Sequence, residues 1–160
     1  MYDCPALLRS WLRTSYFILR TSLLPYEHLD HTGDIAIRVT APTLEELFVE
    51  AARAMTEIIA DPSAARPQLM QDIVVEGEDV ADLWRTWLAE LLYWFSAGNM
   101  IFVEFAVTLQ GARRCVAKAR GEPYDPDRHP LRTELKAVTY HQLEVRQTKD
   151  GWEGQVIFDV

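Results

Sequence analysis

The spacing of apolar residues along this chain changes from a period of two to the spacing of a helix, and later returns to a period of two. Around residues 35–39 apolar side chains alternate with small or polar ones, as in a half-buried strand. Residues 44–59 and 80–95 show helical spacing, and alternation dominates again from residue 101 onward. Strands and helices in this order predict an α+β fold.

The two predicted helices have recognisable ends. Thr43 with Glu46 forms a capping box before the first helix, which ends by Asp61–Pro62. Asp79 can cap the second helix, and Gly98–Asn99 ends it. We predict a mostly antiparallel sheet with these two main helices packed on one face. Besides residues 35–39, the expected strands are Ile73–Val75, Ile101–Leu109, Arg114–Arg120, Glu134–Val145 and Trp152–Val160.

Size and charge limit the classes of function. A chain of 160 residues, 49% of them hydrophobic, fits one domain with its own core. The net charge of -8 and the lack of a Lys/Arg cluster with interleaved aromatics argue against a groove for direct nucleic-acid binding. A basic partner or a cation suits this charge better. Cys4 and Cys115 lack metal-ligand spacing, so we expect reduced thiols and a cytoplasmic location.

Residues 1–25 differ from the rest of the chain. Arg9, Arg13 and Arg20 interrupt each apolar run well before the roughly 18 residues that a membrane helix needs, so we expect no membrane span. We expect a disordered, loosely attached extension, or an over-long reading frame, preceding a domain at 26–160. An amphipathic helix that binds a surface is the alternative.

Carboxylates lie at both ends of the expected domain. Asp34 opens one predicted strand and Asp159 closes another, each on the face opposite most apolar residues of its strand. If these strands are neighbours, both carboxylates would meet the Val160 carboxylate, with His31 in reach. Hard divalent cations prefer such oxygens, and an imidazole could join for a transition metal. Alternatively, Asp30 and Asp34 are turn and cap residues, and Asp159 is a solvated end.

Other polar or aromatic residues have a structural and a functional interpretation. His141 alternates onto an apolar face, so we expect a hydrogen-bonded core residue rather than a catalyst. Glu134 and Lys136 share the other face, as solvated charges or as a contact to phosphate or a partner. Tyr93 lies off the helix stripe that holds Trp84, Trp87 and Trp94, which predicts core tryptophans and a partner contact at Tyr93.

Common enzyme signatures are missing. The chain has no P-loop, no dinucleotide-binding glycine motif, no H-E-x-x-H and no G-x-S-x-G. The sequence is therefore poor in self-contained enzyme parts. Two alternatives stay open: a stand-alone metal-dependent phosphohydrolase that uses Asp34, Asp159 and His31, and a general acidic chaperone that needs no metal. His129, in a proline-containing loop, is expected in a semi-rigid segment, with exposed docking as its alternative.

Several segments together resemble the archease family, and they occur in the family's order from about Tyr26 to Val160. The segments are Tyr26–Ile35 (YEHLDHTGDI), Thr43–Phe48 (TLEELF), Gly121–Glu122, Thr133–His141 (TELKAVTYH) and Val156–Val160 (VIFDV). Gly33 stands where alanine is usual, a change between small residues, and residues 1–24 have no counterpart in the family pattern.

The resemblance implies a protein cofactor rather than an enzyme. Archease activates the RtcB-type, GTP-dependent RNA ligase in tRNA splicing or RNA repair, by promoting ligase guanylylation and multiple turnover, so RNA would be met only through the ligase. It implies a fold of strand-helix-strand-strand modules, one inserted in the other. It also implies a divalent-metal site, for calcium or a magnesium- or manganese-like ion, at Asp34, Asp159 and Val160. His31 and Asp30 match neighbouring motif positions.

Overall fold

The computed structural model describes residues 25–31 and 33–160, and of residues 29–31 it describes the backbone. The expectation for the extension at 1–25 therefore lies outside the described residues, apart from Pro25. Neither helix in the described part of the chain combines the length and the apolar composition that crossing a membrane requires.

From residue 34 onward the elements follow the predicted order, apart from the strand at 134–145, and a strand at Tyr26–His31 was not predicted. Both helices begin at the predicted caps: Thr43 accepts a hydrogen bond from the backbone N–H of Glu46 at 3.2 Å, and Asp79 accepts one from that of Asp82 at 2.8 Å. The elements are β1 (Tyr26–His31), β2 (Asp34–Ala41), α1 (Leu44–Ile59), β3 (Leu69–Glu76), α2 (Val80–Ser96), β4 (Met100–Leu109), β5 (Arg114–Pro123), β6 (Ala137–Val138), β7 (Glu144–Thr148) and β8 (Gly151–Asp159).

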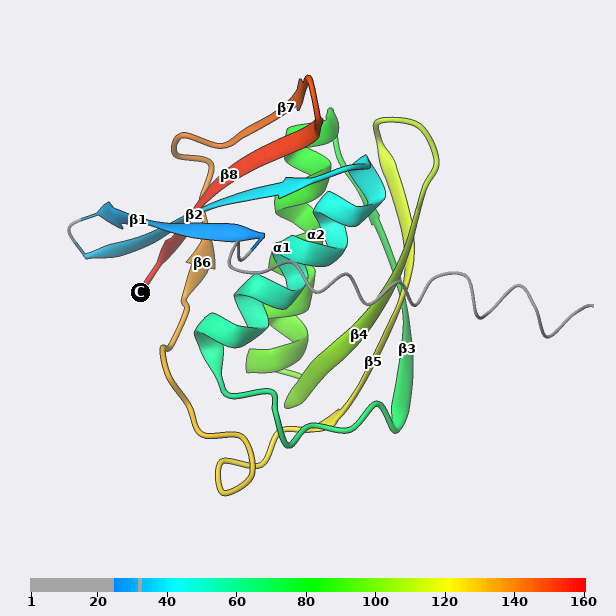
Figure 1. Ribbon diagram of the computed structural model, residues 1–160. Helices are drawn as coiled ribbons and strands as arrows, with labels where there is room; N and C mark the ends of the chain where they lie inside the picture. Colours follow the sequence, from blue (N-terminus) through cyan, green and yellow to red (C-terminus); the bar gives the residue numbers. More distant parts are fainter. Residues whose placement is uncertain (1–24, 32) are drawn as a thin grey trace, which may run out of the picture.

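The described strands form two antiparallel sheets, with the helices between them (Figure 1). One sheet has the order β1-β2-β8-β6, with β7 also paired to β8, and the other has the order β3-β5-β4. The α+β class and the antiparallel pairing are confirmed, and the helices cover one face of each sheet. The division into two sheets differs from the single sheet that we predicted. Helix α1 explains it, because its wide apolar surface contacts β2 and β8 on one side and β4 on the other.

The chain order also shows the nested arrangement that the resemblance implied. The outer module takes β2 and α1 from the first part of the domain and β7 and β8 from its end, and its strands belong to the first sheet. Between them lies β3-α2-β4-β5, a complete strand-helix-strand-strand module with its own sheet. This insertion lets β2, near the start of the domain, pair with β8 at its end.

Two of the three tryptophans of α2 are core residues, as predicted, and Trp94 is partly buried against the core. Trp84 and Trp87 are fully buried, and their indole N–H groups donate to the carbonyls of Leu47 at 3.4 Å and Phe48 at 3.0 Å. These bonds satisfy the polar atom of each ring inside the core and join α2 to α1. Tyr93 is exposed, and a partner contact there stays a prediction.

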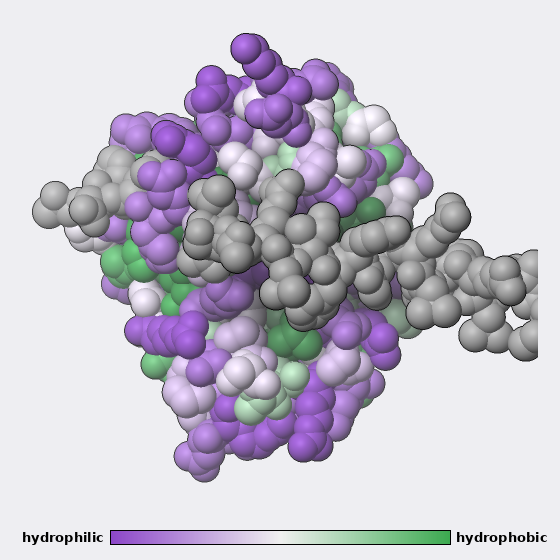
Figure 2. All heavy atoms as spheres, in the orientation of Figure 1, coloured by the Kyte–Doolittle hydropathy of each residue, from purple (hydrophilic) through white to green (hydrophobic). Residues whose placement is uncertain are grey.

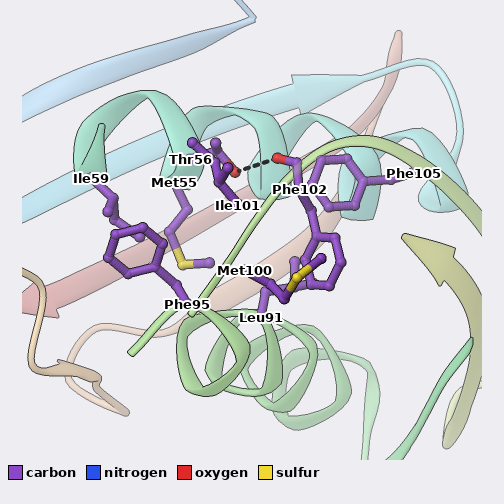
Figure 3. Close-up of a pocket in the computed structure, with 9 residues that line it drawn as sticks. All are labelled: Met55, Thr56, Ile59, Leu91, Phe95, Met100, Ile101, Phe102 and Phe105. Carbon is purple, nitrogen blue, oxygen red and sulfur yellow. Dashed lines mark hydrogen bonds between the residues drawn. The ribbon is translucent and has the colours of Figure 1, made fainter. Parts of the chain in front are cut away.

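A small cavity between α1, α2 and the start of β4 is lined mainly by apolar side chains, including Met55, Phe95 and Phe105 (Figure 3). Its volume is about 20 Å³, which is space for roughly one water molecule. The hydroxyl of Thr56 donates to the carbonyl of Phe102 at 3.3 Å, so it is already partnered. The cavity is therefore a packing gap rather than a substrate site.

The predicted strand at 134–145 is interrupted, and the expectation for His141 was wrong. Residues 137–138 form β6, residues 139–143 form a turn with Gln142 at a φ of 50°, and β7 begins at Glu144. Thr139 donates from both its N–H and its hydroxyl to the carbonyl of Ile157, each at 3.0 Å, and the chain then leaves the sheet. The turn ends the alternation, so His141 is exposed.

His129 is fully buried, which contradicts the interpretation of exposed docking. Its Nδ1 accepts a hydrogen bond from the N–H of Asp125 at 3.0 Å, so the proton of the neutral ring lies on Nε2, which is 2.9 Å from Oε1 of Glu122. Glu122 is also buried, and Oε1 accepts further bonds from Arg128 at 2.9 Å and from the N–H of Arg66 at 3.1 Å. This cluster joins the loops that follow α1 and β5.

Candidate functional site

Asp34 and Asp159 are direct cross-strand partners. Strands β2 and β8 are antiparallel, and their ladder runs from Asp34 opposite Asp159 to Ala41 opposite Trp152. Figure 1 shows the end of β8 beside the beginning of β2. The adjacency on which the sequence-based site depended is therefore confirmed. Partners of this kind have Cβ atoms about 4.5–5.5 Å apart.

Local sequence sets the face on which the two carboxylates lie. Ile37 and Val39 of β2 are buried against the helices, as are Val156 and Phe158 of β8. Strand alternation then places both aspartates on the opposite face. A slip of one residue in the register would bring a carboxylate into the core, so burial of the apolar face holds the pair together.

The turn before β2 needs an unusual backbone. Gly33 has a φ of 83°, a left-handed conformation that glycine adopts without the strain of a Cβ. The turn brings β1 back along β2, so that the backbone position of His31 lies opposite Asp34 and that of Asp30 opposite Ile35. The side chains of Asp30 and His31 lie outside the described residues.

The electrostatics of the pair are unfavourable without a counter-charge. Asp34 is half-buried and Asp159 is exposed. On the side of the molecule seen in Figure 1, hydrophilic residues cover much of the described surface (Figure 2). Like charges directly opposite one another destabilise a sheet. Within the described part of the chain, neither carboxylate forms an ion pair with an arginine, lysine or histidine. A bound cation would remove the repulsion.

The donor atoms fit a hard cation, but the described side chains do not complete a ligand set. Residues 25–28 and 33–160 contain no group of three or more His, Cys, Asp or Glu side chains that could hold a metal ion. The aspartate pair supplies two carboxylates, and Val160, half-buried against the core, follows Asp159 directly. Oxygen donors of this kind suit calcium, magnesium or manganese better than a soft metal.

The structure adds Lys136 to the neighbourhood of the pair. The N–H of Lys136 donates to the carbonyl of Asp159 at 2.8 Å, and Ala137 is the partner of Asp159 on the side away from β2. The sequence suggested a phosphate or partner contact at Lys136 without placing it near the acidic residues. Only the pairing of β6 with β8 brings an exposed cationic side chain and the aspartates to one end of a sheet.

The Glu122 cluster is a structural feature away from this sheet end. The hydrogen bond from Arg128, followed by those from His129 and the backbone of Arg66, lowers the pKa of Glu122 to about 2, although burial acts in the opposite direction. The carboxylate is therefore charged at neutral pH and fully occupied in holding two loops. It has no accessible surface for a substrate, since Glu122 is 3% exposed.

Comparison with protein families and known proteins gives a consistent result. The archease protein family (MTH1598/TM1083) matches residues 26–160. The protein archease of Methanopyrus kandleri is 40% identical over 140 residues, which cover 86% of this chain and 100% of that protein. The protein archease of Pyrococcus furiosus is 37% identical over 139 residues, covering 84% of this chain and 98% of that protein. The name archease states no catalytic activity.

Solved structures agree with these sequence matches. The solution structure of Methanobacterium thermoautotrophicum protein 1598 has a TM-score of 0.77 at 29% identity and covers 86% of this chain and 100% of that one. The crystal structure of a Thermotoga maritima archease, described as a possible chaperone, has a TM-score of 0.57 at 20% identity, with 84% and 96% covered, and it supports the fold alone. From residue 26 to residue 160, the chain belongs to the archease family.

Proposed function

We propose that the protein is an activator of an RtcB-type, GTP-dependent RNA ligase that works through an acidic, cation-binding end of its first sheet. The observation that carries the proposal is the direct pairing of Asp34 with Asp159, in a chain of the archease family. The missing nucleotide-binding motifs agree with a helper that leaves GTP and RNA to the ligase. Its activity would promote guanylylation of the ligase and multiple turnover in tRNA splicing or RNA repair.

Asp34 and Asp159 would hold the divalent cation, together with the carboxylate of Val160. His31 and Asp30 are further candidates, because β1 brings their backbone positions to the same end of the sheet. A calcium, magnesium or manganese ion there would supply a positive charge to which phosphate oxygens can bind. The two aspartates orient the ion, and Lys136 adds a second cationic group beside Asp159.

Charge also suggests how the two proteins meet. The net charge of -8 favours association with a basic surface, such as the rim of a site that handles GTP and RNA. In this proposal the protein contacts RNA only through the ligase, and both proteins work in the cytoplasm. The acidic end of the sheet would face the mouth of the ligase active site.

A guanylylation assay on the cognate ligase tests the proposal. We expect the wild-type protein to increase both the rate of ligase guanylylation and the number of turnovers, and Asp34→Asn and Asp159→Asn to lose most of this stimulation. The matched control is Asp127→Asn, which removes the same charge from an exposed position in the loop after β5. Full stimulation by both site variants would exclude the cation-binding mechanism.

The two alternative functions, a phosphohydrolase and a chaperone, predict different results with the same purified protein. A stand-alone phosphohydrolase would cleave a phosphoester without the ligase and would stop in the presence of a chelator. A general acidic chaperone would suppress the aggregation of unrelated proteins and would be indifferent to Asp34→Asn; the Thermotoga maritima archease is described as a possible chaperone.

A further inference from the structure

The turn that follows β6 is fastened to the first turns of α2 by three side chains. The hydroxyl of Tyr140 donates to Oδ1 of Asp82 at 3.0 Å, and the guanidinium carbon of Arg85 lies 4.0 Å from the centre of the Tyr140 ring. Arg85 also donates from Nη1 to the carbonyl of Val138 at 3.0 Å. We call Asp82, Arg85 and Tyr140 the α2 clamp.

Strand β6 has only a short ladder, and its other support comes from Val138, which is buried in the core. It contains two residues, and it pairs with β8 through Ala137 opposite Asp159 and Val138 opposite Phe158. So short an edge strand gains little from its own ladder. The bonds on either side of it, from Lys136 to Asp159 and from Thr139 to Ile157, depend on β6 staying in place.

We propose that Arg85 and Tyr140 are positioning residues for the acidic site, because they hold β6, and with it Lys136, against the end of β8 that carries Asp159. The contacts form a continuous path from Arg85 through Val138 to the Asp159 backbone. On its other side, Asp159 is held by β2. The end of β8 is therefore fixed from both edges, and the functional meaning of this inference rests on the proposed function.

Arg85 has features that a residue serving only for packing would not need. Its side chain is 18% exposed, and its Nε is buried without a hydrogen-bond partner within the described part of the chain, since Oδ1 of Asp82 lies 4.0 Å away. Leaving a buried donor unpaired is costly. The planar guanidinium can stack on a ring and donate to a carbonyl at the same time, whereas a lysine ammonium lacks that planar surface.

Tyr140 also differs from an ordinary surface aromatic. It is 63% exposed, so burial of its ring cannot be its main contribution. The aromatic ring stacks against the guanidinium of Arg85, and the hydroxyl donates a hydrogen bond to Asp82. Asp82 is held in turn, because it accepts the N–H of Glu78 at 2.9 Å. That bond, together with the bond from Tyr140 and the nearby charge of Arg85, lowers the pKa of its carboxyl group, although burial acts in the opposite direction. The clamp is therefore charged and organised at neutral pH.

The test compares Arg85→Met, Arg85→Lys and Tyr140→Phe with Arg146→Met in the full chain. Arg146 bonds Glu153 across β7 and β8, on the same sheet but away from Asp159, so its removal controls for the loss of a cross-strand charge. The first readout is hydrogen exchange at the amides of Lys136 and Thr139, measured by NMR. The second is calcium affinity, measured by titration calorimetry with calcium alone.

We expect Arg85→Met to accelerate exchange at both amides and to weaken calcium binding by about tenfold, as for other residues that orient metal ligands. Arg85→Lys should fail to restore the wild-type values. Tyr140→Phe keeps the stacked ring and removes only an exposed hydroxyl, so it should have a smaller effect in the same direction. Arg146→Met should change neither readout.

Unchanged exchange at Lys136 and Thr139 in Arg85→Met would overturn the inference. Faster exchange with wild-type calcium affinity would also overturn it, because the clamp would then stabilise β6 without serving the site. If the wild-type protein binds no calcium and does not stimulate the ligase, the proposed function fails. In that case the exchange data still decide whether the clamp positions β6.

Discussion

Asp34 and Asp159 lie directly opposite each other on β2 and β8, although nearly the whole domain separates them in the chain. Elsewhere on the same two strands, charges are compensated. Arg38 of β2 donates to Gln155 at 3.2 Å, and its Nε lies 3.9 Å from Glu153. Among the described side chains of β2 and β8, the like-charged pair is therefore an exception, and such local conflicts are expected at functional sites.

This conflict predicts that a neutral residue stabilises the metal-free protein. We expect Asp34→Asn and Asp159→Asn each to raise the free energy of unfolding by about 0.5 kcal/mol in the presence of a chelator, because cross-strand repulsion is removed. Urea denaturation with and without calcium is the measurement. With calcium, the wild-type protein should gain stability and the variants should gain much less.

Asp127→Asn serves as the control for the change in net charge. It should respond to calcium as the wild-type protein does. Destabilisation of the chelated protein by both site variants would show that the carboxylates contribute favourable contacts of their own.

Gly154, which lies on β8 away from Asp159, provides a test of core packing. A Cβ at this position would lie 2.7 Å from Cη2 of the Trp84 ring, closer than atoms in contact allow. We expect Gly154→Ala to lower the free energy of unfolding by about 2 kcal/mol, the usual cost of overpacking a core. Urea denaturation of Gly154→Ala, Trp84→Phe and the double variant gives the coupling between the two sites.

The smaller phenylalanine ring makes room for the added methyl group. Gly154→Ala should therefore cost less in the Trp84→Phe background than in the wild type. Equal costs in the two backgrounds would contradict direct contact as the cause.

The buried Glu122 predicts a pH dependence of stability. Its pKa is lowered from 4.5 to about 2, so the folded state favours the charged form, and the resulting stabilisation is present above about pH 4.5 and is lost as the pH falls toward 2. Glu122→Gln should therefore unfold at a lower urea concentration than the wild type at pH 7, and this difference should shrink as the pH is lowered through that range.

Glu45→Gln, an exposed residue in the first turn of α1, is the comparison. The urea concentration at which half of Glu45→Gln is unfolded should stay closer to the wild-type value than that of Glu122→Gln does. A difference between Glu122→Gln and the wild type that stays constant down to pH 3 would rule out ionisation of Glu122 as the source.

Cys115 should be chemically inert in the folded protein. The thiol is fully buried in β5, and burial raises its pKa to about 12, so almost no thiolate forms at neutral pH. In a Cys4→Ser variant Cys115 is the single cysteine of the sequence. A thiol reagent such as dithionitrobenzoate should then react only as fast as the protein unfolds. Rapid stoichiometric reaction without denaturant would show that β5 opens locally.

Part of the site follows from local sequence patterns, and part does not. The alternation around Asp34 and Asp159 determined the face of each carboxylate, and β2 and β8 bear this out. Nothing in the sequence near Lys136 indicated that it lies beside Asp159. That proximity depends on the pairing of Ala137 and Val138 with the end of β8. The core position expected for His141 and the exposed alternative for His129 were wrong, since a turn ends the alternation at His141 and a buried hydrogen bond joins His129 to Glu122.

Local sequence patterns were sufficient to predict the two helices with their caps, most of the strands and the α+β class. These features depend on interactions between residues close in the chain, where propensity, capping and apolar period act directly. Three features became visible only in the tertiary structure: the strands form two sheets around α1 and α2, β2 pairs with β8, and β6 is hydrogen-bonded to α2. These features depend on which apolar surfaces pack together although they are far apart in the chain, and local sequence patterns carry no information on that packing.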